Sequence, residues 1–123
     1  MTGSVVLLTV VQPPVITSEY APMIENLGEI TAAGEKAAAQ QLGKLQERLQ
    51  TAEIPTETLQ RTGGPIAHIL QQAKEQRADY IVMGSHGHTA FYDLLVGSTT
   101  HGVLMRAPCP VVIVPPKEKG ART

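Results

Sequence analysis

The pattern of apolar and polar positions along the chain predicts an alternation of strands and helices. Residues Val5–Val11 are almost continuously apolar and rich in β-branched side chains, which is typical of a parallel strand covered on both faces. From about residue 23 to residue 52 the apolar side chains instead recur at helical spacing, at Leu42, Leu45, Leu49 and Ala52. Three glycines interrupt this segment, and each weakens a helix by about 1 kcal/mol relative to alanine, which predicts an irregular or kinked first half.

The remaining segments continue this alternation. Residues 54–62 form a short strand in which polar side chains dominate, which predicts an edge position. A helix is expected from Pro65 to about residue 77, and its apolar stripe consists of Ile66, Ile69, Leu70 and Ala73. Residues 81–83 form a buried strand, Ser98 is expected to cap a helix that runs to about Arg106, and Val111–Val114 is a last buried strand. Four strands joined by three helices predict an α/β fold with a parallel sheet and right-handed crossovers.

Composition narrows the class of protein. With 123 residues, of which 42% are hydrophobic, the chain suits a single domain over residues 1–116 followed by a polar tail at 117–123. A formal net charge of −1 offers no basic surface for nucleic acid. No apolar run approaches the roughly 20 residues of a membrane helix, and no secretory leader is evident. The single cysteine, Cys109, cannot form an internal disulfide, which suits a reducing compartment. We therefore expect a cytoplasmic protein without nucleic-acid or membrane partners.

The candidate chemistry lies in a glycine-rich stretch after the third strand. Gly84 and Gly87 follow that strand, and Gly97, Ser98 and Thr99 open the next helix. Glycine lets the backbone approach a ligand, and free N–H groups at a helix N-terminus favour phosphate. The stretch lacks the lysine of a P-loop and the compressed glycines of a dinucleotide fingerprint. A phosphate site is one interpretation, and the other is that the glycines only form turns while Ser98 only caps the helix.

The spacing of these residues also carries a family resemblance. Glycine, two residues, glycine, nine residues, glycine and serine, from Gly84 to Ser98, resembles the ATP-binding motif of the universal stress protein family. Residues 64–70, 78–87 and 108–114 resemble that family's third helix and its fourth and fifth strands, and the likeness runs from about residue 4 to residue 116. The resemblance implies the family's adenine-nucleotide alpha-hydrolase-like fold, in which helices sandwich a parallel sheet.

The same resemblance implies a set of nucleotide contacts. ATP or another adenine nucleotide is the expected cofactor, with Mg²⁺ as an optional companion. The family's ribose and phosphate contacts fall on Met83, Gly84, Gly87, Gly97, Ser98 and Thr99. Val10 matches the family position at the adenine pocket, and His86, which lies between two glycines, is a further candidate contact.

One part of the family pattern has no counterpart here. The first strand, which ends in a nucleotide-binding aspartate, and the first helix find no match, and residues 5–11 resemble the second strand. In the family that first strand lies in the middle of the order 3-2-1-4-5, so its absence would leave buried backbone groups unpaired at about 1 to 3 kcal/mol each. Two arrangements would fill the gap: strand 2 pairs directly with strand 4, or another chain supplies complementary surface through strand exchange or tight dimerisation. We expect the first, with four strands in the order 3-2-4-5, in family numbers. The resemblance also implies a homodimer through the last strand, Val111–Val114.

The functional hypotheses remain two. The first is a regulatory stress-response protein that binds an adenine nucleotide, and the second is a nucleotide-free structural or dimerisation module that retains the glycine motif. An enzyme is not expected, because no general base is paired with a nucleophile and no lysine or arginine lies near the motif, although slow ATP hydrolysis stays open. His86, His88 and His101 lack a carboxylate or cysteine at a spacing that would complete a metal site, so none is expected.

Overall fold

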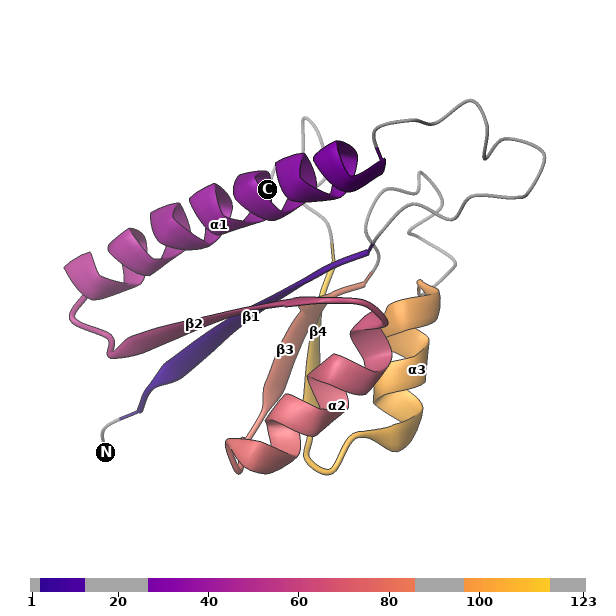
Figure 1. Cartoon of the computed structure of the whole chain (residues 1–123). Coiled ribbons are helices and arrows are strands. Elements are labelled where there is room, and N and C mark those ends of the chain that lie inside the picture. The colour runs from indigo at the N-terminus through magenta and orange to yellow at the C-terminus, as the bar shows by residue number, and fades with distance from the viewer. Residues whose placement is uncertain (1–2, 13–26, 86–96, 116–123) are drawn as a thin grey trace. The chain divides into compact units, whose positions relative to one another are not determined.

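The computed structural model describes residues 3–12, 27–85 and 97–115 of the chain (Figure 1). Strands and helices alternate in the predicted order: β1 (Val5–Val11), α1 (Leu27–Thr51), β2 (Thr56–Thr62), α2 (Pro65–Glu75), β3 (Ile81–Gly84), α3 (Ser98–Arg106) and β4 (Val111–Val114). The chain divides into two compact units, Met1–Pro65 and Ile66–Thr123, and each is described by itself. The single domain over residues 1–116 stays a prediction.

The first unit is a strand–helix–strand motif in which α1 packs along β1 and β2 (Figure 1). The two strands are parallel, and their register runs from Val5 opposite Thr56 to Val11 opposite Thr62. Side chains of β2 bind α1 directly, because Gln60 Nε2 donates to the Glu35 carbonyl at 2.8 Å and Thr62 Oγ1 donates to Glu35 Oε2 at 2.7 Å. The polar character of β2 therefore has a structural use at its contact with α1.

The predicted irregularity of α1 is wrong. The helix is continuous over its 25 residues, although it contains Gly28, Gly34 and Gly43. Intrinsic propensity is a weak term, and packing against the sheet overrides it. Leu42 is buried at 6% exposure, whereas Leu45 on the predicted stripe is exposed at 36%.

The second unit holds a short parallel pair and two helices. Ile81 of β3 lies opposite Val111 of β4, and Gly84 lies opposite Val114. Val103 of α3 is fully buried, and a Cβ added at Gly102 would overlap the side chain of Ile66, so α3 packs closely against α2. Gln72 of α2 is also buried, because it follows Ile69 by three residues and so shares the apolar stripe.

The predicted sheet order is confirmed in part. The pairs 3-2 and 4-5, in family numbers, are present as β2–β1 and β4–β3. A direct ladder between β1 and β3 is not among the pairs of the described strands, which form two two-stranded sheets.

The described helices also bear on the membrane prediction. None of those in residues 27–85 and 97–115 combines the length and the apolar character that a membrane span requires.

Candidate functional site

Two hydrogen bonds fix the start of α3 against the end of β3. The Gly97 N–H donates to the Ser85 carbonyl at 2.8 Å, and Thr100 Oγ1 donates to the Gly84 carbonyl at 2.7 Å. The Ser85 N–H in turn donates to the Val114 carbonyl at 3.1 Å, which extends the β3–β4 ladder by one residue. The first turn of α3 is therefore held at the carboxyl end of the strand pair by bonds within the described residues.

The residue that caps α3 is Gly97, and the prediction that Ser98 is the N-cap is wrong by one position. Gly97 has extended backbone angles, φ −60° and ψ 156°, and no side-chain hydrogen bond caps the helix. The His101 N–H donates to the Gly97 carbonyl at 2.9 Å, which makes Gly97 the first acceptor of the helix. The N–H groups of Ser98, Thr99 and Thr100 precede that bond, so no carbonyl of the helix is in reach of them.

A buried hydroxyl without a partner lies at the same place. Ser85 is only 7% exposed, and its Oγ makes no hydrogen bond in the structure. Thr100, at 3% exposure, contrasts with it because its hydroxyl is paired with the Gly84 carbonyl. A buried hydroxyl without a partner costs about 1 to 3 kcal/mol in proteins. Ser85 Oγ is therefore a donor that protein atoms cover and whose hydrogen bond is not made in the structure.

No packing contact among the described residues requires a glycine at position 84. A Cβ added there would meet one atom within 4 Å, the Val114 carbonyl oxygen at 4.0 Å, which is an ordinary van der Waals contact that an alanine could make. The residue is also exposed. A strand glycine without a packing role often marks close approach of another molecule to the backbone. The open side of Gly84 therefore fits a ligand surface.

The sequence-predicted site residues fall into three groups. Met83, Gly84, Gly97, Ser98 and Thr99 lie at the end of β3 and the start of α3 in the second unit. Val10 lies in β1 of the first unit. His86 and Gly87 lie outside the described residues. The assignment of these residues to a nucleotide stays a prediction.

Sequence reasoning missed Ser85 and Thr100 as members of this site. Ser85 stands directly between Gly84 and the glycine loop, and Thr100 follows Thr99, so both were adjacent to the motif. The sequence does show an uninterrupted run of hydroxyl residues at the helix start. It does not show which of them are buried and which are exposed. Ser98 is exposed, Thr99 is half-buried and Thr100 is buried.

The described residues do not form a candidate metal site. Within residues 3–12, 27–85 and 97–115, no three side chains of His, Cys, Asp or Glu come together as a metal site. His86 and His88 lie outside these ranges, and Cys109 is half-buried with a free thiol.

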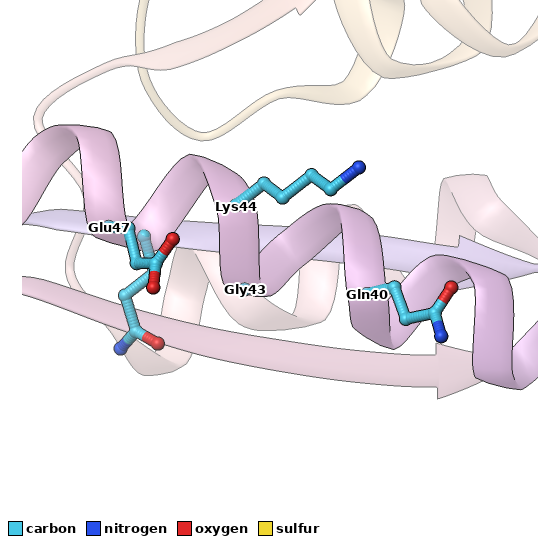
Figure 2. Close-up of a pocket in the computed structure, with 5 residues that line it drawn as sticks. Gln40, Gly43, Lys44 and Glu47 are labelled. Atoms are coloured by element: carbon cyan, nitrogen blue, oxygen red, sulfur yellow. The ribbon is translucent and has the colours of Figure 1, made fainter.

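A shallow hollow on α1 has a different character (Figure 2). Its lining residues all belong to that one helix: Gln40, Gly43, Lys44, Gln46 and Glu47. Figure 2 shows the Lys44 and Gln40 side chains extending along the outside of the helix. None of the predicted nucleotide contacts lines this hollow, so it is a solvated helix surface.

The match to known proteins decides the family. The model of the universal stress protein family matches residues 1–115. The chain belongs to the universal stress protein family. A universal stress protein of Thermus aquaticus, named for its position 3′ of a QAH/OAS sulfhydrylase gene, is 35% identical over 104 residues, which cover 80% of this chain and 74% of the relative. Universal stress protein YxiE of Bacillus subtilis is 32% identical over 88 residues, which cover 72% of this chain and 60% of YxiE.

Solved structures of universal stress proteins share the fold. The hypothetical protein MJ0577 superposes with a TM-score of 0.77 at 25% identity, and the match covers 97% of this chain and 80% of that protein. A family member from Arabidopsis thaliana with AMP bound gives a TM-score of 0.60 at 20% identity, over 91% of this chain and 64% of the other. A universal stress protein in complex with cAMP gives 0.55 at 22% identity, over 93% of this chain and 98% of the other. The fold is thus the α/β, adenine-nucleotide alpha-hydrolase-like fold that the resemblance implied.

Proposed function

We propose that this universal stress protein binds an adenine nucleotide, ATP or a relative of it, and that its phosphate lies at the N-terminus of α3. The observation that carries the proposal is the start of α3, which two hydrogen bonds fix against the end of β3 and whose first N–H groups have no acceptor within the helix. Such N–H groups and the positive end of the helix dipole stabilise an anion. The open side of Gly84 leaves room for a sugar or phosphate at the strand end.

The remaining contacts follow the family motif. Met83 and Gly84 would contact the ribose from β3, and Gly97, Ser98 and Thr99 would hold the phosphate from α3. His86 and Gly87 would contribute from the loop between them, and Val10 would border the adenine. The family members with AMP and with cAMP support an adenine nucleotide as the ligand. Mg²⁺ would accompany a bound triphosphate.

The role that fits this site is regulation rather than catalysis. Within residues 81–85 and 97–101 the only titratable side chain is His101, which is exposed. A general base held against a nucleophile is not formed by these residues, so bound nucleotide would change the contacts of the protein rather than be consumed. Turnover of ATP above about one per second would contradict this assignment.

Calorimetry with adenine nucleotides tests the proposal. Titration of the full chain with millimolar AMP and ATP should give saturable heat, and Gly97→Val should abolish most of it by crowding the phosphate. Gly43→Ala in α1 is the matched control and should bind like the parent chain. Absence of heat and of any thermal shift with every nucleotide would favour the nucleotide-free module instead.

We further propose that the protein forms a homodimer through β4. This strand pairs with β3 along one edge, and its other edge has no partner among the described strands. Val112 and Val114 are exposed at 43% and 49%, which supports an apolar contact with a second copy. Val112→Lys should convert a dimer mass in light scattering to a monomer mass, whereas Met105→Lys on α3 should not. A monomer mass for the parent chain at micromolar concentration would remove this proposal.

A further inference from the structure

The hydrogen bonds of the first unit show which backbone groups of β1 lie at its free edge. The Val5 N–H donates to the Pro55 carbonyl at 2.9 Å. At the other end of the strand pair the Gly63 N–H donates to the Val11 carbonyl at 2.9 Å. Because backbone groups alternate in direction along a strand, the odd-numbered residues of β1 face β2 and the even-numbered ones face away. The residues that face away have no ladder partner among the described strands: Val6, Leu8 and Val10.

The outer edge of β2, in contrast, is covered by side chains of the same unit. Arg61 Nη1 donates to the Gln60 carbonyl at 2.9 Å. Gln46 Nε2 of α1 donates to the Thr56 carbonyl at 3.4 Å. Both carbonyls belong to even-numbered residues of β2, which face away from β1. The strand β1 contains no charge and no proline, and no described side chain bonds its outward backbone groups. Edges that must not pair carry such protection, so β1 has the character of an edge that pairs and β2 does not.

The flank of α1 on the β1 side carries exposed apolar side chains. A Cβ added at Gly34 would lie 3.6 Å from Val11, so Gly34 marks this flank. Glu35, which two side chains of β2 bind, marks the opposite flank. Ile30 and Leu45 are exposed at 45% and 36%. At helical spacing from Gly34 they belong to one exposed row on the β1 side, which consists of Ile30, Gly34, Ala37, Gln41, Leu45 and Arg48.

The middle of this row lies over the middle of β1. Gly34 lies beside Val11 at one end of the strand. Gln46 bonds to the residue that is paired with Val5 at the other end. The helix therefore runs antiparallel to β1 between these two points. The residues about halfway between them are Leu8 in the strand and Gln41 in the row.

We infer that the first unit binds a second copy of itself through the free edge of β1, around a twofold axis at Leu8. In an antiparallel pair, Leu8 exchanges two hydrogen bonds with Leu8 of the partner subunit, and Val6 exchanges two with Val10 of the partner subunit. Every outward N–H and C=O of both strands is then used. This contact is separate from the one proposed for β4, because it involves the first unit alone.

The spacing of the paired strands also suits the two helices. Since α1 contacts both β1 and β2, it lies over the midline of the pair (Figure 1). An axis perpendicular to the sheet keeps both helices on one face, and the two midlines are then two strand spacings apart, roughly 10 Å. Packed helices lie about 8 to 10 Å apart. The two rows therefore meet, with Gln41 at the axis and Leu45 opposite Ala37 of the partner subunit. The joined sheet ends at two covered β2 edges, so this contact closes at two copies.

Light scattering of a variant without the β4 contact tests this inference. Three residues of a strand and one helix flank make a small interface, so we expect it to be weak. Val112→Lys should give a monomer mass at about 10 μM and a dimer mass at about 1 mM. Adding Leu45→Lys should keep the monomer mass at both concentrations, with unchanged circular dichroism. Gln40→Lys places the same charge on the outside of α1 and is the matched control, which should still dimerise (Figure 2). A monomer mass for Val112→Lys at about 1 mM overturns this inference and leaves the β4 proposal standing.

Cysteines near the axis provide a second readout. In a Cys109→Ser background, Gln41→Cys should form a disulfide between two copies on oxidation, because the axis brings the two thiols together. Gln40→Cys, about 100° away around the helix, is the control and should form far less. Equal yields from the two variants overturn the inference. Protection of the Leu8 N–H from hydrogen exchange in Val112→Lys at about 10 μM also overturns it, because another segment of the same chain would then occupy the edge.

Discussion

Replacing Ser85 with alanine should change stability and nucleotide binding in opposite directions. The side chain is 7% exposed and its hydroxyl has no hydrogen-bond partner, so the folded protein without ligand bears an uncompensated desolvation cost. That cost is about 1 to 3 kcal/mol, and removing one oxygen atom leaves a void too small to cancel it. We expect Ser85→Ala to raise the free energy of unfolding of the ligand-free protein by about 1 kcal/mol. For a chain of this size the midpoint of thermal unfolding should rise by about 4 °C.

Thr100→Val is the matched control for Ser85→Ala because it also removes one buried hydroxyl at the same site. Thr100 Oγ1 donates to the Gly84 carbonyl at 2.7 Å, so its loss breaks a bond instead of relieving an unpaired group. We expect Thr100→Val to lower the free energy of unfolding by about 1 kcal/mol. Urea unfolding followed by circular dichroism measures both variants. A lower stability for Ser85→Ala, of the same sign as Thr100→Val, would refute the reasoning about an unpaired hydroxyl.

Ser85→Ala should also bind AMP less tightly than the parent chain does. If Ser85 Oγ donates to the phosphate, its loss removes one hydrogen bond worth about 0.5 to 1.5 kcal/mol, or roughly twofold to tenfold in affinity. At a concentration one hundred times the dissociation constant, AMP should raise the stability of the parent chain by about 2.7 kcal/mol. Ser85→Ala should show a smaller rise at that concentration. An unchanged AMP affinity would place the ligand away from Ser85.

Three glycine substitutions give further expected outcomes. Gly43→Ala adds a methyl group that has no atom within 4 Å, in the middle of α1. Because alanine favours a helix more than glycine does, the free energy of unfolding measured in urea should rise by about 1 kcal/mol. Gly102→Val should lower stability by about 1 to 3 kcal/mol, since its side chain would overlap Ile66 of α2, and stability equal to the parent would contradict that packing. Gly84→Ala should leave the free energy of unfolding within about 0.5 kcal/mol of the parent, because the added methyl group meets only the Val114 carbonyl oxygen at 4.0 Å, while titration shows weaker AMP binding.

The element order of this fold could be predicted from periodicity, because each segment has one strong period. The continuous β-branched run of β1 and the helical spacing of leucines in α1 left no competing interpretation. The kink expected in α1 was wrong since glycine propensity was weighed without the sheet, whose side chains bind the helix at Glu35. The predicted pairing of β1 with β3 is not among the pairs of the described strands, and the sequence could not decide it, because a pairing between separate segments depends on the register and spacing of both strands.

The candidate site could be located from the sequence but not resolved. The glycine spacing identified the end of β3 and the start of α3, both of which the structure brings together. The cap was misassigned to Ser98, because a serine beside a glycine is the stronger N-cap on propensity alone. Thr100 differs from Ser98 and Thr99 in being buried. Its burial depends on how α3 packs against the strand end, and the local sequence pattern does not contain that information.

The unpaired hydroxyl of Ser85 links the stability of this protein to its function. Alanine at this position would remove a cost of about 1 kcal/mol or more from the ligand-free fold, so packing alone favours alanine over serine there. Thr100, in the first turn of α3, shows that the same environment can satisfy a hydroxyl when a carbonyl is in reach. A buried group that destabilises the folded protein is a recurrent feature of functional sites, where stability is lower than the fold permits. The opposite signs expected for Ser85→Ala and Thr100→Val therefore test, without any ligand, whether the Ser85 hydroxyl is unpaired in the folded protein.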